Sequence, residues 1–332
     1  MENDSRRLYE ISKQDISIRV MYAFILRCLE QLKPRKRSKI KLFRALNHYR
    51  YVAICFLENI IVRYARISHC KLVQSDALTV VCSLTTYPGR IEQCFYAIKT
   101  LLLQSCPPNR IVLWLASSQF HDRTLPSSYE LLKELGVEIR YCDDLRSHKK
   151  YFYALQEQKQ NEVIITFDDD IVYHPDTIKR ALDMHKKYPN SIVCNDAKEI
   201  ILNKNNNTLA PYSNWPKTED GIKVPSIYKY SVMTGSGCLY PYNVVPKQMF
   251  CIENIKDIAF TADDIWITFT AKAFGVKVVP TEIVARKYTT ISNSQISHLA
   301  KFNCLEGGND LAILRMCELY PEMKRDMLEA LI

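Results

Sequence analysis

Short apolar runs alternate with amphipathic helical segments between residues 77 and 194 of this chain. The apolar runs occupy 78–84, 111–116, 137–141, 163–167 and 191–194. Residues at helical spacing fill the intervals near 91–102, 129–135, 148–158 and 175–185. Strands and helices that alternate at this spacing predict an α/β fold in which helices flank a mostly parallel, doubly wound sheet.

The regular alternation ends near residue 195. The stretch 203–221, NKNNNTLAPYSNWPKTEDG, is rich in Asn, Pro and Thr, which predicts a loop or a loose hairpin. A segment with two glycines follows at 228–242, then a helix around Trp266 and Phe269 and a strand at 276–280. We expect a nucleotide-type sheet followed by an irregular part that grips a substrate.

The first 75 residues carry most of the net charge. They hold 16 Lys+Arg and 6 Asp+Glu, a net +10, whereas the remainder holds 29 and 30, a net −1. Residues 8–66 are typical of two helices joined by a segment, 33–44, in which seven of twelve residues are basic. Such helices can lie in a membrane interface or pack on the main domain, and the sequence leaves both open. Because the body has no basic stripe, we expect an anionic membrane surface rather than nucleic acid as the partner.

The cysteines and the N-terminal residues indicate a compartment. None of the twelve cysteines belongs to a C-x-x-C pair, and most lie inside apolar runs, which is typical of reduced, buried thiols. MENDSRRLYE lacks the apolar core of a signal peptide, and no stretch predicts a transmembrane helix. We expect a cytoplasmic protein, with peripheral binding to the inner face of the plasma membrane if residues 1–75 dock there.

Three consecutive carboxylates follow the apolar run VIITF. Asp168, Asp169 and Asp170 then lie where open α/β sheets bind ligands, and their mutual repulsion favours a bound cation or other donors. On a strand that continues past the sheet, Asp168 and Asp170 would share a side and Asp169 would face the other way. Two carboxylates at this spacing suit Mg²⁺ or Mn²⁺ shared with substrate phosphates. A solvated acidic turn is the alternative.

A second acidic pair, Asp263 and Asp264, opens the predicted helix around Trp266. Carboxylates there can serve as helix caps favoured by the helix dipole. Alternatively, one of them acts as a general base on a hydroxyl.

Three further motifs carry polar or glycine residues next to predicted strands. In a chain with eight glycines, Gly235 and Gly237 around Ser236 indicate close backbone approach to a ligand, or a turn that needs positive φ. Thr85, Tyr87 and Arg90 follow the first strand, where Tyr87 could stack on a base and Arg90 could meet a phosphate or carboxylate, or form an ordinary turn. Asp143 or Asp144 follows the third strand, and Lys149 or Lys150 could touch phosphate or simply be exposed.

Taken in order, these motifs resemble a glycosyltransferase of the GT-A fold. The resemblance covers roughly residues 77–290 and is nearest to the bacterial family-2-like enzymes that build capsular or lipopolysaccharide chains. It implies a GT-A domain at 76–300, a basic helical extension at 1–75, and a C-terminal loop and helix at 301–332. It also implies a nucleotide-diphosphate sugar donor, a saccharide or lipid-linked acceptor, and Mn²⁺ or Mg²⁺.

The resemblance assigns roles to individual residues. Asp168 would contact the ribose or the metal, Asp170 would hold the metal at the donor diphosphate, and Asp169 could substitute for a neighbour. Asp264 would be the base of an inverting enzyme, with Asp263 as the rival base, and His298 is a candidate third metal ligand. The nucleotide and the sugar would be framed by Thr85, Tyr87, Arg90, Asp143 or Asp144, Lys150, Gly235, Ser236 and Gly237.

Two other enzyme classes share parts of this pattern. A haloacid-dehalogenase-like phosphohydrolase also places Asp-x-Asp after an apolar strand, and there Asp168 would be a covalent nucleophile. That motif normally sits on the first strand of its core, whereas three β/α units precede it here. A sugar nucleotidyltransferase would need a Gly-rich, Arg-containing loop after the first strand, which is missing. A membrane-docked scaffold with a degenerate site is the non-enzymatic alternative.

Overall fold

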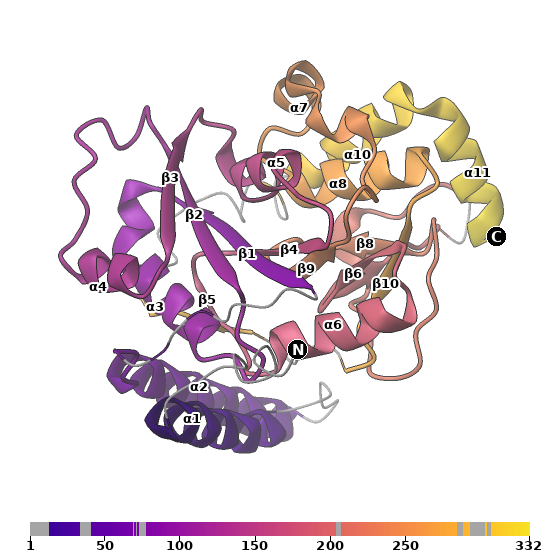
Figure 1. The fold of residues 1–332 in the computed structure, drawn as a ribbon. Helices are drawn as coiled ribbons and strands as arrows, with labels where there is room; N and C mark the ends of the chain where they lie inside the picture. Colours follow the sequence, from indigo (N-terminus) through magenta and orange to yellow (C-terminus); the bar gives the residue numbers. More distant parts are fainter. Residues whose placement is uncertain are drawn as a thin grey trace, which may run out of the picture.

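A seven-stranded sheet forms the centre of the computed structural model, which describes residues 13–33, 41–68, 70, 72, 78–203, 207–283, 288–292, 303 and 307–332 (Figure 1). The strand order is β10-β6-β9-β4-β1-β2-β3. All neighbours pair in parallel except β9, which runs antiparallel to β4 and β6. The bounds are β1 Thr79–Thr86, β2 Arg110–Ala116, β3 Glu138–Cys142, β4 Glu162–Phe167, β6 Ser191–Cys194, β9 Ser236–Tyr240 and β10 Lys277–Pro280.

Helices cover both faces of this sheet, as the alternating pattern predicts. Every residue of β4 is buried, because apolar side chains on both sides of the strand meet a helical layer. One layer contains α3 (Ile91–Leu102), α4 (Ser128–Glu134) and α6 (Thr177–Lys187). The opposite layer contains α5 (Lys149–Gln156), α7 (Ile252–Ile258), α8 (Asp263–Ala273), α10 (Gly308–Leu319) and α11 (Pro321–Leu331). The predicted mostly parallel α/β sheet is confirmed.

The direction of β9 determines which segments meet at one edge of the sheet. β1, β4 and β6 all end at the same edge, and the antiparallel β9 begins there. Residues 168–170, 195–196 and 235–236 therefore come together, although more than 60 residues separate the first group from the last in the chain. This carboxyl edge is where ligands bind in open α/β sheets.

Two short sheets connect this edge to other parts of the molecule. β5 (Ile171–Val172) directly follows the three carboxylates and pairs with β11 (Thr289–Thr290). β7 (Ala197–Glu199) pairs with β8 (Tyr230–Val232), just before the glycines of the 235–237 segment.

The N-terminal helices α1 (Lys13–Leu32) and α2 (Lys41–Tyr64) lie together against the layer that contains α3 and α6 (Figure 1). Their inner sides contribute Tyr22, Leu26 and Val62 to the core between that layer and the sheet. Arg19 on α1 also donates a hydrogen bond to the carbonyl of Leu102 at the end of α3. The two predicted helices are confirmed, and one side of each packs on the body.

The C-terminal segment forms two helices where the sequence predicts one. α10 ends at Leu319, and α11 begins at Pro321, a residue that is well suited to the first turn of a helix. Met316 and Met327 from these helices are completely buried in the same core as α8. Among the described residues no helix is long and apolar enough to cross a bilayer.

Candidate active site at the carboxyl edge of the sheet

The three consecutive aspartates lie in the turn that ends β4. Tyr173 fixes the start of this turn, because its hydroxyl accepts a hydrogen bond from the amide of Asp168 (2.7 Å) and donates one to the carbonyl of Gly235 (2.6 Å). The amide of Ile291 donates to the carbonyl of Asp170 (2.8 Å) at the other end. The acidic turn is thus held between β9 and the segment that contains β11.

Gly235 makes room for the carboxylate of Asp168. A Cβ atom at position 235 would lie 1.8 Å from Oδ2 of Asp168 and 2.0 Å from its Cγ, far inside van der Waals contact. Gly237 has a different reason to be glycine, since its φ is +92° at a bulge where β9 changes register against β4. The predicted need for positive φ is confirmed at Gly237, whereas Gly235 is closely approached by the side chain of Asp168, and its predicted approach to a ligand stays a prediction.

Asp169 and Asp170 both meet Arg90. Nη1 of Arg90 lies 2.8 Å from Oδ1 of Asp169 and 3.1 Å from Oδ2 of Asp170, and Thr86 donates a hydrogen bond to Asp169. We expected a continuing strand to place Asp169 and Asp170 on opposite sides. The chain instead turns at residues 169–170, so one guanidinium reaches both carboxylates.

Burial and crowding of like charges raise the pKa of these carboxyl groups. The pKa of Asp170 is raised to about 7 by its burial and by the charge of Asp168, against the opposing effect of Arg90. Burial also raises the pKa of Asp169, although Arg90 and Thr86 favour its ionised form. The acidic turn therefore holds protons more readily than an exposed carboxyl group would.

Lys150 connects the acidic turn to the second acidic pair. Its Nζ lies 2.6 Å from Oδ1 of Asp168 and 3.0 Å from Oδ2 of Asp263, and its side chain is only 3% exposed. Burial disfavours the ammonium form, but the surrounding carboxylates outweigh burial and raise the pKa of Lys150. Lys150 is therefore a buried cation shared by two acidic segments that lie 95 positions apart in the sequence.

Asp263 and Asp264 begin α8, as the sequence predicts, but they have different surroundings. The hydroxyl of Thr234 donates to both, at 2.7 Å to Asp263 and 2.6 Å to Asp264, and the amide of Thr234 donates to Asp264 at 2.7 Å. Burial opposes ionisation of Asp263, but Lys150 outweighs it and lowers the pKa. Burial and the charge of Asp263 raise the pKa of Asp264 to about 7. Asp264 therefore exchanges a proton near neutral pH, and Asp263 stays ionised.

The other residues singled out in the sequence lie around this network without joining it directly. Asp144 pairs with Lys149 (2.7 Å) and accepts a hydrogen bond from Gln119, whereas Asp143 is exposed. The Thr85 hydroxyl donates to the carbonyl of Trp114, the Ser236 hydroxyl donates to the carbonyl of Met233, and the Tyr87 ring lies 5.7 Å from the Arg90 guanidinium. His298 lies outside the described residues.

Sequence reasoning missed four residues of this edge. Thr234 donates hydrogen bonds to the acidic pair that begins α8, and Tyr173 accepts a hydrogen bond from the first residue of the acidic turn. Asp196, which is completely buried, follows β6 and pairs with Lys217, which is half-exposed. The sequence holds a signal for Asp196: the apolar run SIVC is followed by Asn-Asp, as VIITF is followed by three aspartates. The roles of Thr234 and Tyr173 depend on tertiary contacts that no local pattern shows.

The acidic network offers carboxylate oxygens, which are the ligands that Mg²⁺ and Mn²⁺ prefer. The network joins five carboxylates (Asp168, Asp169, Asp170, Asp263 and Asp264) to two cations (Arg90 and Lys150). Fully ionised, it has three negative charges in excess, which protons or a metal ion can offset. Among the described residues, no three or more His, Cys, Asp or Glu side chains are arranged closely enough to hold a metal ion on their own.

No protein-family model matches the sequence, and no curated protein matches it significantly.

Proposed function

We propose that this chain is a metal-dependent glycosyltransferase of the GT-A type, which moves a sugar from a nucleotide-diphosphate donor to an acceptor hydroxyl. The observation that carries the proposal is the bridge from Asp168 through Lys150 to Asp263. Through this bridge Asp168 and Asp170, which would hold the metal ion at the donor diphosphate, lie next to Asp263 and Asp264, one of which would accept a proton. The mostly parallel sheet, with its ligand-binding edge at this network, supports the same proposal.

Asp168 and Asp170 would hold the cation beside the donor diphosphate. When bound, Mn²⁺ or Mg²⁺ would supply neutralisation of the charge that develops on the leaving diphosphate. Arg90 holds the acidic turn in shape through Asp169, so its charge is engaged by the protein itself. Gly235 leaves the space that the Asp168 carboxylate needs.

Asp264 is the better of the two candidate bases. A general base works best when its pKa lies near the operating pH, and the pKa of Asp264 is raised to about 7. Asp263 is held ionised by Lys150, which makes it a weak proton acceptor. In this proposal, the Asp264 carboxylate takes the proton of the acceptor hydroxyl as the hydroxyl oxygen attacks the anomeric carbon. Thr234 orients the carboxylate through two hydrogen bonds.

The test combines ligand binding with turnover. A panel of nucleotide sugars is screened by thermal shift with Mn²⁺, Mg²⁺ or a chelator, and hits are assayed for transfer to saccharide and lipid-linked acceptors. Asp170→Asn should remove the metal-dependent shift, whereas Asp264→Asn should keep the shift and suppress transfer. Asp183→Asn, at an exposed position on α6, is the matched control and should behave as the wild type.

Two outcomes would overturn the proposal. One is the absence of any metal-dependent shift with the whole panel, together with hydrolysis of a generic phosphate monoester that Asp168→Asn abolishes; that result would indicate a phosphohydrolase. The other is normal transfer by Asp170→Asn. If Asp263→Asn suppresses transfer and Asp264→Asn does not, the base assignment is wrong while the enzyme class stands.

A further inference from the structure

The N-terminal helices α1 and α2 have apolar side chains on their outer sides as well as on their inner sides. Met21 and Phe24 on α1 are exposed, and so are Tyr49, Phe56, Ile60 and Tyr64 on α2. Phe24 is 65% exposed, Phe56 64% and Tyr64 76%. A helix on the surface of a soluble domain normally turns a polar side to water, and a helix that is apolar all round is usually buried in protein or lipid.

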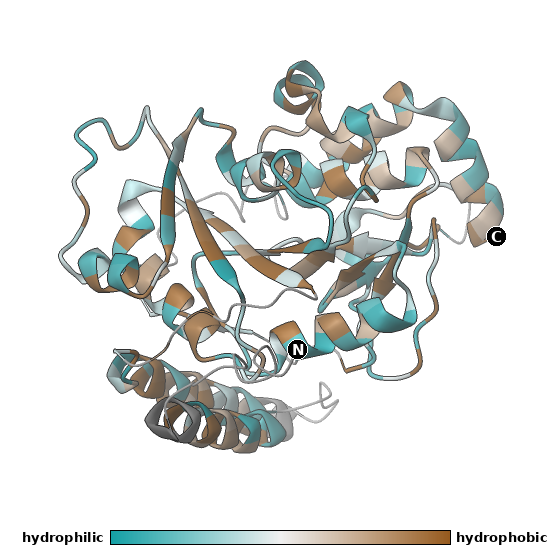
Figure 2. Cartoon of the chain, viewed as in Figure 1, coloured by the Kyte–Doolittle hydropathy of each residue, from teal (hydrophilic) through white to brown (hydrophobic). Residues whose placement is uncertain are grey.

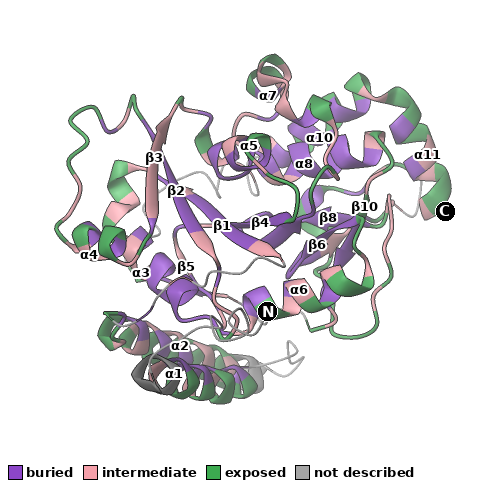
Figure 3. Ribbon diagram, viewed as in Figure 1, coloured by how far each residue is buried: buried purple, intermediate pink, exposed green. Residues whose placement is uncertain are grey.

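We call the exposed apolar side chains of α1 and α2 together the outer face. Along each helix they recur three, four or seven positions apart, so within each helix they lie on one side. At the edge of this face Phe56, Ile60 and Tyr64 also line a hollow of about 550 Å³ that α2 forms with residues of α3. The two helices pack against each other, which joins the two stripes. In Figure 2 apolar residues colour both helices, and in Figure 3 exposed residues line the side that is turned away from the sheet.

Charge is distributed unequally between the inner and outer sides. Among the side chains that the structure describes on α1 and α2, the carboxylates are Glu30 and Glu58, and both are buried against the body. Arg50 and Arg63 are exposed and form no ion pair with a described residue, and the Arg63 guanidinium lies 5.8 Å from the centroid of the Tyr96 ring on α3. The outer face is therefore apolar and cationic, which complements an anionic lipid surface.

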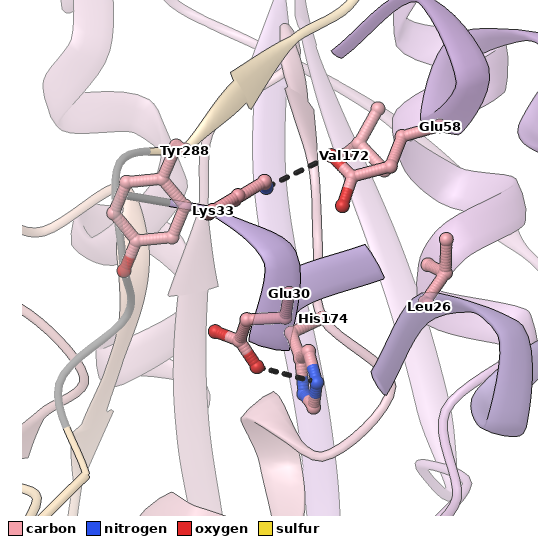
Figure 4. Close-up of a pocket in the computed structure, with 7 residues that line it drawn as sticks. All are labelled: Leu26, Glu30, Lys33, Glu58, Val172, His174 and Tyr288. Atoms are coloured by element: carbon pink, nitrogen blue, oxygen red, sulfur yellow. Dashed lines mark ion pairs between the residues drawn. The ribbon is translucent and has the colours of Figure 1, made fainter. Parts of the chain in front are cut away.

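Buried ion pairs fix these helices to the body (Figure 4). Glu30 pairs with His174 (2.7 Å) and Arg180 (3.1 Å) of the body. Lys33 pairs with Glu58 (2.8 Å), which joins the end of α1 to α2, and its ammonium also donates a hydrogen bond to the hydroxyl of Thr289 on β11 (3.1 Å). Burial opposes ionisation of Glu30, but His174 and Arg180 outweigh it and lower its pKa to about 2. These pairs surround a cavity of about 20 Å³, too small for a ligand larger than water. A membrane bound at the outer face would therefore meet the whole molecule in one orientation.

We propose that the outer face of α1 and α2 docks on an anionic lipid bilayer, with both helices lying in the membrane interface. Neither helix is apolar enough to span the membrane, so the contact is peripheral. A second copy of the chain fits less well, because a two-fold interface would bring the arginines of both copies together without a carboxylate among the described side chains of this face. The proposal is independent of the glycosyltransferase reaction.

Flotation with lipid vesicles tests the proposal with the full chain. Vesicles of phosphatidylcholine alone are compared with vesicles that also contain phosphatidylglycerol, at low and high salt. The wild type should float with the anionic vesicles and release as salt rises. Phe24→Gln with Phe56→Gln should weaken partitioning roughly tenfold or more through lost apolar burial. Arg50→Gln with Arg63→Gln should weaken it about fivefold for each arginine.

Controls separate docking from misfolding and from self-association. Ile222→Gln, at an exposed apolar position (89% exposed) outside these helices, should float as the wild type does. Circular dichroism and sedimentation velocity without lipid check that each variant keeps its fold and its mass. The proposal is overturned if the wild type does not float with anionic vesicles, or if the double variants float as well as it does. It is also overturned if the phenylalanine variant converts a dimer to a monomer, since the outer face would then join two copies.

Discussion

Replacing Lys150 with methionine should destabilise the protein strongly, and more at alkaline than at acidic pH. The ammonium group is buried between Asp168 and Asp263, and methionine would fill much of the same volume without the charge. Removing one partner of a buried ion pair typically costs about 3–5 kcal/mol of unfolding free energy, because an uncompensated charge stays behind. We expect a loss of this size at pH 8.

The pH dependence follows from the direction of the pKa shifts. In the wild type the pKa of Asp263 lies below its unfolded value, so its contribution to stability is present above that unfolded value and is lost as pH falls. Without Lys150, burial and the neighbouring Asp264 should raise the folded pKa of Asp263 above the unfolded one. The unfolding free energy of the variant should then fall as pH rises through that raised pKa. The difference from wild type should therefore be smallest near pH 5 and largest near pH 8.

Urea unfolding followed by circular dichroism between pH 5 and pH 8 measures both effects. Lys149→Met is the matched control, since the neighbouring lysine on the same helix pairs with Asp144, whose side chain is partly exposed. Both lysines are 3% exposed, but the Asp144 side chain is 20% exposed against 11% for Asp263, so water reaches the carboxylate that is left behind more easily and the control should lose less than Lys150→Met does. If Lys150→Met costs no more than the control at pH 8, or if its cost does not depend on pH, the reasoning about the buried bridge is wrong.

One further substitution and one pH series test the site. Gly235→Ala should cost about 1–3 kcal/mol of unfolding free energy, because the added methyl group would overpack against Asp168. The same variant should weaken metal-dependent nucleotide binding measured by calorimetry. Unchanged binding would show that the position of Asp168 is not critical. The rate of sugar transfer at saturating donor should rise about tenfold per pH unit below pH 7 and level off above it, because Asp264 acts in its deprotonated form. A flat profile between pH 6 and pH 8 would exclude Asp264 as the base.

The strands, the helices and the position of the acidic segments could be read from the sequence because each depends on a local pattern. A buried parallel strand such as β4 is a continuous apolar run, and the acidic residues at its end need no tertiary information to be noticed. The insertion of β9 between β4 and β6 could not be predicted, since strand order is set by packing over long sequence distances. That insertion is what brings Gly235 against Asp168.

The partners within the site were harder to predict than its members. From its chemistry, Arg90 was expected to bind a phosphate or a carboxylate. It pairs with two carboxylates, Asp169 and Asp170, because the chain turns at these residues. For Lys150 the sequence left a phosphate contact and exposure equally open, whereas the structure buries it between two acids. In each case the residue type was informative, but the partner depended on where the backbone turned.

The way α2 meets the β5–β11 ribbon matters for anyone who wishes to shorten this chain. The hydroxyl of Tyr51 and the amide of Asn59 donate hydrogen bonds to the carbonyls of Tyr288 and Thr290, and the amide of Ile291 in turn holds Asp170. A truncation at residue 75 would thus remove, along with the basic region, the contacts to the segment that holds the acidic turn. An inactive fragment of that kind would say nothing about lipids, so point substitutions are the safer experiment.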